Sequence, residues 1–221
     1  MTAAVRIKRN GGFKTYQVEY TPDTTIAKIL DEINETEEDP IAWDCSCRQK
    51  MCGNCAMLIN RRPALACITF LKDLGNVITL EPLSKFPLIK DLKVDRSRMI
   101  ELRKILNVYP EEGADADWQE HDRQYLAASC LSCGCCLEVC PNYNGRDLFG
   151  GAALSNSMFK EISQESNPEK RRERTRVYKK TQFRDCTKSL SCVTVCPMSL
   201  PMASTFSRLN ACAFGQMKRK P

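Results

Sequence analysis

A dense run of cysteines, CLSCGCCLEVCP between Cys130 and Pro141, constrains this chain more than any other feature of its sequence. Two residues separate each of the first three cysteines in register, and three more precede Cys140, which is followed directly by Pro141. Closely spaced thiolates are soft ligands that select soft metal centres. The run therefore predicts that this part of the chain wraps around a metal centre.

The spacing is that of the cluster-binding run of bacterial ferredoxins. In such runs three thiolates bind one iron–sulfur cluster, and the fourth, next to the proline, binds the other cluster of a two-cluster domain. A second run is therefore expected, and DCTKSLSCVTVCP provides it with Cys186, Cys192 and Cys196. Ser189 occupies the position that corresponds to Cys133 of the first run.

If each run lends its last cysteine to the other, the two clusters receive unequal sets of ligands. The complete set has four thiolates and predicts a 4Fe-4S cluster on Cys130, Cys133, Cys136 and Cys196. The other set has three and predicts a cube lacking one iron, a 3Fe-4S cluster, on Cys140, Cys186 and Cys192. A serine oxygen ligand from Ser189 is the competing interpretation, but hydroxylate is a harder and less common partner for iron than thiolate.

A third cysteine pattern lies in the first half of the chain. Cys47, Cys52 and Cys55 have gaps of four and then two residues, the spacing of plant-type ferredoxins, and Cys67 lies further downstream. Gly53, between two of these cysteines, leaves room for the backbone to approach the cluster closely. The pattern predicts a 2Fe-2S cluster.

Two alternatives to this assignment are open. Zinc usually takes pairs of Cys-x2-Cys or sets of Cys and His, whereas here one gap is four residues and the only histidine, His121, is distant. Cys45 could replace Cys47, but the four-residue gap to Cys52 selects Cys47. Three cysteines are left without a cluster: Cys45, Cys135 and Cys212.

The composition bears on compartment and partners. The 14 cysteines could form disulfides, but MTAAVRIKRN lacks the apolar segment of a secretory signal, which favours metal-bound thiolates. No stretch has the roughly 20 apolar residues of a membrane span. The net charge is +6, and its densest basic stretch, KRRERTRVYKK, indicates a solvated helix face rather than a nucleic-acid site. Nucleic acid is a weak alternative for that stretch, and an anionic membrane surface or an acidic partner is an alternative of about equal weight.

The first half of the chain has the pattern of a small α+β domain. Apolar and polar residues alternate around Gly11-Gly12 over residues 4–20, which predicts a β-hairpin. A helix capped by Thr24 or Thr25 follows, and residues 56–60 and 77–80 are further expected strands, with a turn at NRRP. Together they predict a β-grasp sheet with the cluster loop at one edge. The prolines within residues 82–95 indicate a linker, so the domains are 1–92 and 93–221.

The second half has helical periodicity. A stripe of Met99, Leu102, Ile105 and Leu106 predicts the first helix, and an acidic loop at 111–118 precedes a second that leads to Cys130. Further helices are expected at about 152–162, in the basic stretch, and after Pro201. This half is expected to be an all-α, bacterial-ferredoxin-like domain that holds both cubane-type clusters.

The order CSCRQKMCGNC, Cys67, CLSCGCCLEVCP and CTKSLSCVTVCP resembles the iron–sulfur subunit of succinate dehydrogenase and fumarate reductase over nearly the whole chain. The resemblance implies the same three ligand sets. It also implies partners: a flavoprotein subunit with FAD and the dicarboxylate site, and a cytochrome b-type membrane anchor with haem b. This chain would then be a peripheral electron-transfer subunit, without a dicarboxylate site, on the cytoplasmic side of the inner (plasma) membrane.

The quinone end departs from the family pattern. Pro141 matches the proline that borders the quinone pocket in relatives, but the tryptophan found shortly after it in many of them is absent. Thr187 stands where some members have histidine, so Pro141, Thr187 and Ser189 are candidate quinone contacts. The segments CLSCGCCLEVCP and SLPMASTFSRLN resemble members that use menaquinone.

Two other classes of function are consistent with clusters or cysteines. One is an iron–sulfur relay subunit of another flavin-dependent oxidoreductase, such as a thiol-linked fumarate reductase or a heterodisulfide-reductase relative. Those carry further cysteine-rich domains after the ferredoxin half. The other is a purely structural metal-binding module, which a colourless, zinc-containing preparation would indicate. No Ser/His/Asp set or glycine-rich phosphate loop predicts an independent reaction on this chain.

Overall fold

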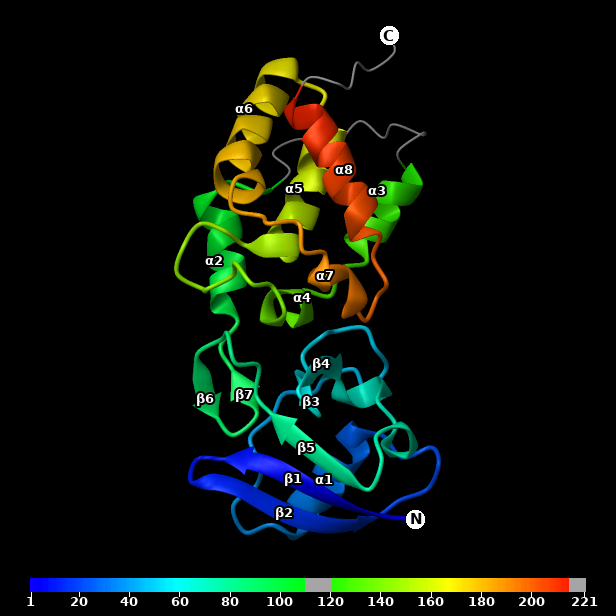
Figure 1. Cartoon of the computed structure of the whole chain (residues 1–221). Helices are drawn as coiled ribbons and strands as arrows, with labels where there is room; N and C mark the ends of the chain where they lie inside the picture. The colour runs from blue at the N-terminus through cyan, green and yellow to red at the C-terminus, as the bar shows by residue number, and fades with distance from the viewer. Residues whose placement is uncertain (110–120, 215–221) are drawn as a thin grey trace. The chain divides into compact units, whose positions relative to one another are not determined.

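The computed structural model describes residues 1–109 and 121–214, and its backbone divides into two compact units (Figure 1). The first comprises Met1–Arg96 and Leu131–Glu138, and the second Ser97–Cys130 and Val139–Pro221. The acidic loop expected at 111–118 lies outside the described residues. The domain boundary at residue 92 stays a prediction, because the compact units interleave in sequence.

The first unit begins with the expected β-hairpin. Strand β1 (Thr2–Arg9) pairs antiparallel with β2 (Gly12–Glu19), with Val5 opposite Tyr16. Alternate side chains of β1, including Val5 and Ile7, are fully buried, as expected when a strand has one face on the core. Gly12 has φ +132°, a conformation that favours glycine, and this confirms the turn predicted at Gly11-Gly12.

The hairpin belongs to a five-stranded sheet of order β2-β1-β5-β3-β4. Strand β5 (Val77–Glu81) is parallel to β1, and β3 (Ala56–Ile59) is antiparallel to β5. Strand β4 (Arg62–Leu65) was not expected, because its first two residues fall in the predicted NRRP turn. The turn itself is only Asn60-Arg61, both at positive φ, the geometry of a two-residue hairpin loop.

Helix α1 (Ile26–Thr36) supplies a further part of the core of this unit. Its N-cap is Thr25, whose side chain accepts a hydrogen bond from the N–H of Lys28. Its buried residues recur at helical spacing, as predicted, and they are Ile26, Ala27, Ile29, Leu30 and Ile33. Helix and sheet together form the α+β, β-grasp domain that the sequence predicts.

The segment expected to be a linker is instead folded. Strands β6 (Leu88–Lys90) and β7 (Lys93–Val94) form a small hairpin. The side chains that it and its approach bury are Leu83, Phe86, Leu92 and Val94. The linker prediction is wrong because apolar side chains between the prolines anchor this segment to the first unit.

The second unit is a group of helices around α5 (Gly151–Gln164), ten of whose residues are buried (Figure 1). Four other helices pack against it or its neighbours: α2 (Ser97–Ile105), α3 (His121–Ala128), α6 (Pro168–Tyr178) and α8 (Met202–Ala213). The core includes Leu102, Met158, Phe159 and Leu209. One expected core residue is wrong: Ile105 is 56% exposed, because α2 ends there and Leu106 turns inward.

Shorter helical pieces carry the two cysteine runs. Helix α4 (Cys135–Glu138) belongs to the first unit and α7 (Ser191–Thr194) to the second. A π-helical turn, Lys179–Phe183, continues α6 before the second run. Within residues 1–109 and 121–214, no helix combines the length and the apolar composition that crossing a bilayer requires.

Candidate iron–sulfur cluster sites

The β3–β4 hairpin brings two predicted 2Fe-2S ligands together. Cys55 immediately precedes β3, and Cys67 lies in a 3-10 turn (Ala66–Ile68) that directly follows β4. The N–H of Ala66 donates to the carbonyl oxygen of Cys55 at 3.1 Å, so the hairpin pairing continues up to both cysteines. Burial raises the pKa of the Cys55 thiol to about 12, although a backbone hydrogen bond from Cys67 acts in the opposite direction.

The loop around Cys47 is shaped to surround a sulfur atom. The Sγ of Cys47 accepts hydrogen bonds from the N–H groups of Gln49 (3.5 Å), Met51 (3.2 Å) and Cys52 (3.3 Å). These backbone donors lower the pKa of the Cys47 thiol to about 7. Arg48 and Lys50 both have positive φ, and alternation of this kind turns successive N–H groups to one side of a loop.

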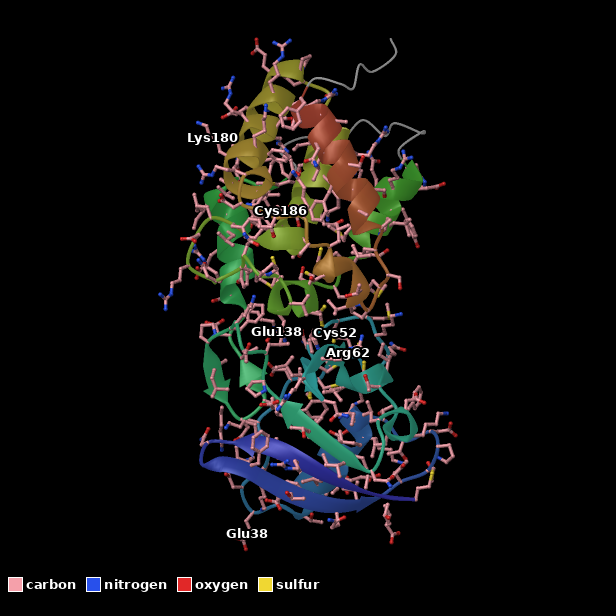
Figure 2. All side chains as sticks on the ribbon, viewed as in Figure 1. Glu38, Cys52, Arg62, Glu138, Lys180 and Cys186 are labelled. Atoms are coloured by element: carbon pink, nitrogen blue, oxygen red, sulfur yellow. The ribbon has the colours of Figure 1, made fainter. Side chains whose placement is uncertain are left out.

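Cys45 differs from Cys47 in its burial and in the direction in which the pKa of its thiol is shifted. Its thiol is half-buried, and burial raises its pKa. Backbone N–H groups that point at a sulfur are what tune a bound cluster, and three of them point at Cys47. Cys47 as the ligand in place of Cys45 stays a prediction, which these three donors support. Figure 2 labels Cys52, the second predicted ligand of this loop.

The cysteines predicted to bind the 4Fe-4S cluster come from both compact units. Cys133 and Cys136 belong to the first unit, and Cys130 and Cys196 to the second. A hydrogen bond from the side chain of Cys135 lowers the pKa of the buried Cys133 thiol to about 7, and the charge of Arg96 acts in the same direction. Cys135 itself is fully buried, which agrees with its interpretation as a small core residue.

The three cysteines predicted to bind the 3Fe-4S cluster line one pocket of the second unit. Cys140, Cys186 and Cys192 surround it together with Thr187, Ser189 and Phe149. Burial raises the pKa of the Cys192 thiol, and the neighbouring Cys140 and Cys186 raise it further. The start of α5 forms another wall through Ala152. Figure 2 labels Cys186, which enters this pocket after the π-helical turn.

The two cysteine runs repeat the same backbone conformation. In the first run Ser132 and Gly134 have φ of +52° and +90°. Counted from the first cysteine of each run, the same two positions in the second are Lys188 and Leu190, with φ of +59° and +57°. The second loop therefore keeps the turn of the first although Ser189 replaces the thiolate-bearing residue.

The candidate quinone contacts lie at or beside this pocket. Pro141, Thr187 and Ser189 are all exposed. The Thr187 hydroxyl donates to the side-chain oxygen of Asn142 at 2.9 Å, and Ser189 accepts a hydrogen bond from Ser191 at 3.3 Å. Their roles as quinone contacts stay predictions.

Sequence patterns did not indicate Gln182, which organises a wall of the pocket. Its side chain is 1% exposed and bonds the backbone on both sides of Phe149. Its Oε1 accepts from the N–H of Gly150 at 3.0 Å, and its Nε2 donates to the carbonyl of Leu148 at 2.9 Å. A single glutamine just after a basic stretch gives no signal of such a contact.

The thiols are not gathered as they would be around one ion. In the described part of the chain, no three Cys, His, Asp or Glu side chains lie close enough together to hold a single metal ion.

Two family matches divide the chain as the cysteine patterns do. Residues 4–101 match a family described as 2Fe-2S iron-sulfur cluster binding domain, and residues 126–200 match one described as 4Fe-4S dicluster domain. Fold, cysteine loops and matches together define a two-domain iron–sulfur protein of electron transfer.

Similar proteins identify the family within this class of iron–sulfur proteins. The succinate dehydrogenase iron-sulfur subunit of Bacillus subtilis is 30% identical over 211 residues, covering 88% of this chain and 83% of its own. The fumarate reductase iron-sulfur subunit of Wolinella succinogenes is 34% identical over 212 residues, covering 89% and 87%. The chain belongs to the family of iron–sulfur subunits of succinate dehydrogenase and fumarate reductase.

A solved structure supports the fold. A chain of the Mycobacterium smegmatis Sdh1 complex in the apo form superposes with a TM-score of 0.86 and covers 97% of this chain and 96% of its own, at 22% identity. The β-grasp domain followed by a helical ferredoxin domain is therefore the fold of this chain.

Proposed function

We propose that this subunit relays electrons between the FAD of a flavoprotein subunit and a membrane quinone, with menaquinone favoured. Each bound iron–sulfur cluster supplies one-electron redox chemistry. The chain supplies thiolates in three sets: a 2Fe-2S set on Cys47, Cys52, Cys55 and Cys67, a 4Fe-4S set on Cys130, Cys133, Cys136 and Cys196, and a 3Fe-4S set on Cys140, Cys186 and Cys192.

The observation that carries the proposal is the pocket lined by Cys140, Cys186 and Cys192. It joins the last cysteine of the first run to the first two of the second, as an exchange of ligands between the runs requires. Ser189, at the position of the missing thiolate, also lines the pocket. Three thiolates fit a cluster with three irons, because each iron of a cubane-type cluster takes one ligand from the protein.

Membership of the family supports the proposed partners. A flavoprotein subunit would carry the dicarboxylate site and FAD, and a cytochrome b-type anchor with haem b would hold this chain at the cytoplasmic side of the inner membrane. Thr187 and Ser189 are exposed and line the three-cysteine pocket, and we expect them to face the quinone. Pro141, which directly follows the pocket residue Cys140, would be a third contact.

Low-temperature EPR of the purified complex tests the cluster assignment. We expect a near-isotropic three-iron signal in the air-oxidised sample, and a 2Fe-2S signal after reduction by dithionite. An oxidised sample without a signal, and a reduced one with two interacting four-iron cubes, would show that Ser189 or another group supplies a fourth ligand. The acceptor would then have to be sought elsewhere.

The proposed electron donor and electron acceptor are tested on the same purified complex. Succinate should reduce the 2Fe-2S cluster in the complex but not in the subunit freed of its flavoprotein. A naphthoquinone of low potential should reoxidise the clusters of the complex. If only a high-potential benzoquinone does so, the preference for menaquinone is wrong.

A further inference from the structure

Arg96 connects two cysteine loops of the first unit. Its Nη1 donates to the carbonyl oxygens of Gly53 at 3.0 Å and Cys133 at 3.1 Å, and its Nη2 donates to that of Asn54 at 2.8 Å. Gly53 and Asn54 lie between the predicted 2Fe-2S ligands Cys52 and Cys55, whereas Cys133 is a predicted 4Fe-4S ligand. One guanidinium therefore binds the backbone of both loops.

The two loops also touch directly. Gly53 has φ +73°, and a Cβ placed on it would lie 2.8 Å from the carbonyl oxygen of Leu131 and 2.9 Å from the Cβ of Cys133. Contacts that short do not occur between real side chains and backbone, so only glycine allows this approach. Arg96 thus holds together two loops that the glycine permits to meet.

The chemistry of the guanidinium suits this position. Its planar fork offers several donors in fixed directions, and its charge persists at every physiological pH. A lysine ammonium keeps the charge but cannot span three carbonyl oxygens with the same geometry. A fixed positive charge beside a cluster stabilises the extra negative charge that reduction adds, and so raises the reduction potential.

We propose that Arg96 is a positioning residue that fixes the spacing between the 2Fe-2S loop and the Cys133 loop and raises the potential of the 2Fe-2S cluster. The proposal rests on the assignment of the 2Fe-2S and 4Fe-4S ligands under the proposed function. The proposal assigns a role to Arg96, a residue that is not a cysteine and binds no iron.

The test uses the purified complex with R96M, R96K and, as a matched control, R98M. Arg98 also donates to two backbone carbonyls, those of Arg146 and Asp147, but these belong to a loop of the second unit without a predicted ligand. Two quantities are measured on the 2Fe-2S EPR signal. One is its midpoint potential, and the other is its power saturation when the neighbouring four-iron cluster is reduced, which reports the magnetic distance between them.

R96M removes the charge and the hydrogen bonds together. We therefore expect a lower midpoint potential of the 2Fe-2S cluster and saturation of its EPR signal at lower microwave power. R96K keeps the charge, so we expect a potential near that of the natural protein but easier saturation. R98M should change neither. Loss of the four-iron cluster with retention of the 2Fe-2S signal, in either Arg96 variant, would also support a positioning role.

Three results would overturn the proposal. The first is an R96M complex whose midpoint potential and power saturation equal those of R98M. The second is an R96K complex with unchanged saturation in the case that R96M does not assemble, and the third is loss of every cluster in both Arg96 variants while R98M keeps its clusters. The last result would assign Arg96 to general folding. A natural complex without a 2Fe-2S signal would instead contradict the proposed function itself.

Discussion

At the scale of single residues, the missing thiolate at Ser189 could be found from the sequence alone, by aligning one cysteine run on the other. The conformation around it could not. Leu190 adopts φ +57° where the first run has Gly134, and a leucine there costs about 1–2 kcal/mol relative to a relaxed backbone. No sequence pattern predicts that a leucine accepts this strain, since it follows from the turn that the cluster loop must make.

The repeated turn leads to a prediction for S189C. Because the backbone of the second run already matches that of the first, the new thiolate should complete a four-ligand set. We expect the oxidised near-isotropic EPR signal to disappear and a reduced four-iron signal to replace it. S191C, two residues further along and out of register with the first run, is the control and should keep the three-iron signal.

Gly53 permits a prediction about close approach. G53A should lower the free energy of unfolding by about 1–3 kcal/mol beyond the cost of positive φ, because its Cβ would collide with backbone and Cys133. G75A is the matched control, since Gly75 has φ +80° and no atom within 4 Å of the position that a Cβ would take. Denaturant unfolding of both variants measures the difference. Equal losses would contradict the contact.

At the scale of helices and strands, periodicity predicted the long elements. The β1–β2 hairpin and the helices α1, α5 and α8 have apolar residues at the spacing of their elements, whereas α6 was expected from its basic composition. The short strands β4, β6 and β7 were missed, because two to four residues are too few for a period and Pro63 and Pro87 indicate irregular backbone. Their pairing depends on contacts with distant parts of the chain.

The β6–β7 hairpin depends on a buried carboxylate. Asp91, 2% exposed, accepts from Nε of Arg9 and from the N–H of Ala42, both at 3.0 Å. D91A should destabilise the first unit by about 3 kcal/mol, since it leaves a largely buried guanidinium with a weaker partner. D39A removes the exposed carboxylate that also pairs with Arg9 and should destabilise the first unit much less, because solvent screens an exposed ion pair. Thermal unfolding of the two variants checks the contrast.

Gln182 has a corresponding role in the second unit. Q182M should leave the N–H of Gly150 and the carbonyl of Leu148 without their partner, at a cost of about 2 kcal/mol. It should also broaden the three-iron EPR signal, because Phe149 lines that pocket. Q124M replaces another buried glutamine, whose side chain makes a long 3.5 Å bond to Ser163, and should leave the signal unchanged. A signal equally sharp in both variants would argue against this role.

At the scale of the whole molecule, the cysteine spacing predicted three sites and two domains; the family matches show a 2Fe-2S domain followed by a 4Fe-4S dicluster domain, while the three ligand sets and the domain boundary stay predictions. Spacing could not predict that Leu131–Glu138 belongs to the first unit. That assignment arises from tertiary contacts: Ser84 Oγ and the N–H of Lys85 both donate to the carboxylate of Glu138, at 2.5 and 3.1 Å. Side chains distant in sequence decide such contacts, and no local pattern reports them.

Removal of iron should loosen the cysteine loops before the rest of the molecule. Ligand binding to folded protein contributes folding free energy, and these loops contain little regular structure. After chelation we expect trypsin to cleave rapidly at Arg48, Lys50 and Lys188, with cleavage within α6 as an internal reference. Mass spectrometry of timed digests measures the order. Uniform acceleration at all sites would mean that the clusters stabilise the chain globally.

The membership of Leu131–Glu138 in the first unit also bears on how the chain is made. Domains generally fold as units while the ribosome delivers them from the N-terminus. A nascent chain that has emerged as far as Arg96 already contains every strand of the five-stranded sheet. It still lacks the carbonyl group of Cys133, which Arg96 binds, and the carboxylate of Glu138, which Ser84 binds. The first unit is therefore completed only after translation has passed Glu138, in the middle of the first cysteine run, so its final folding steps coincide with synthesis of the second half.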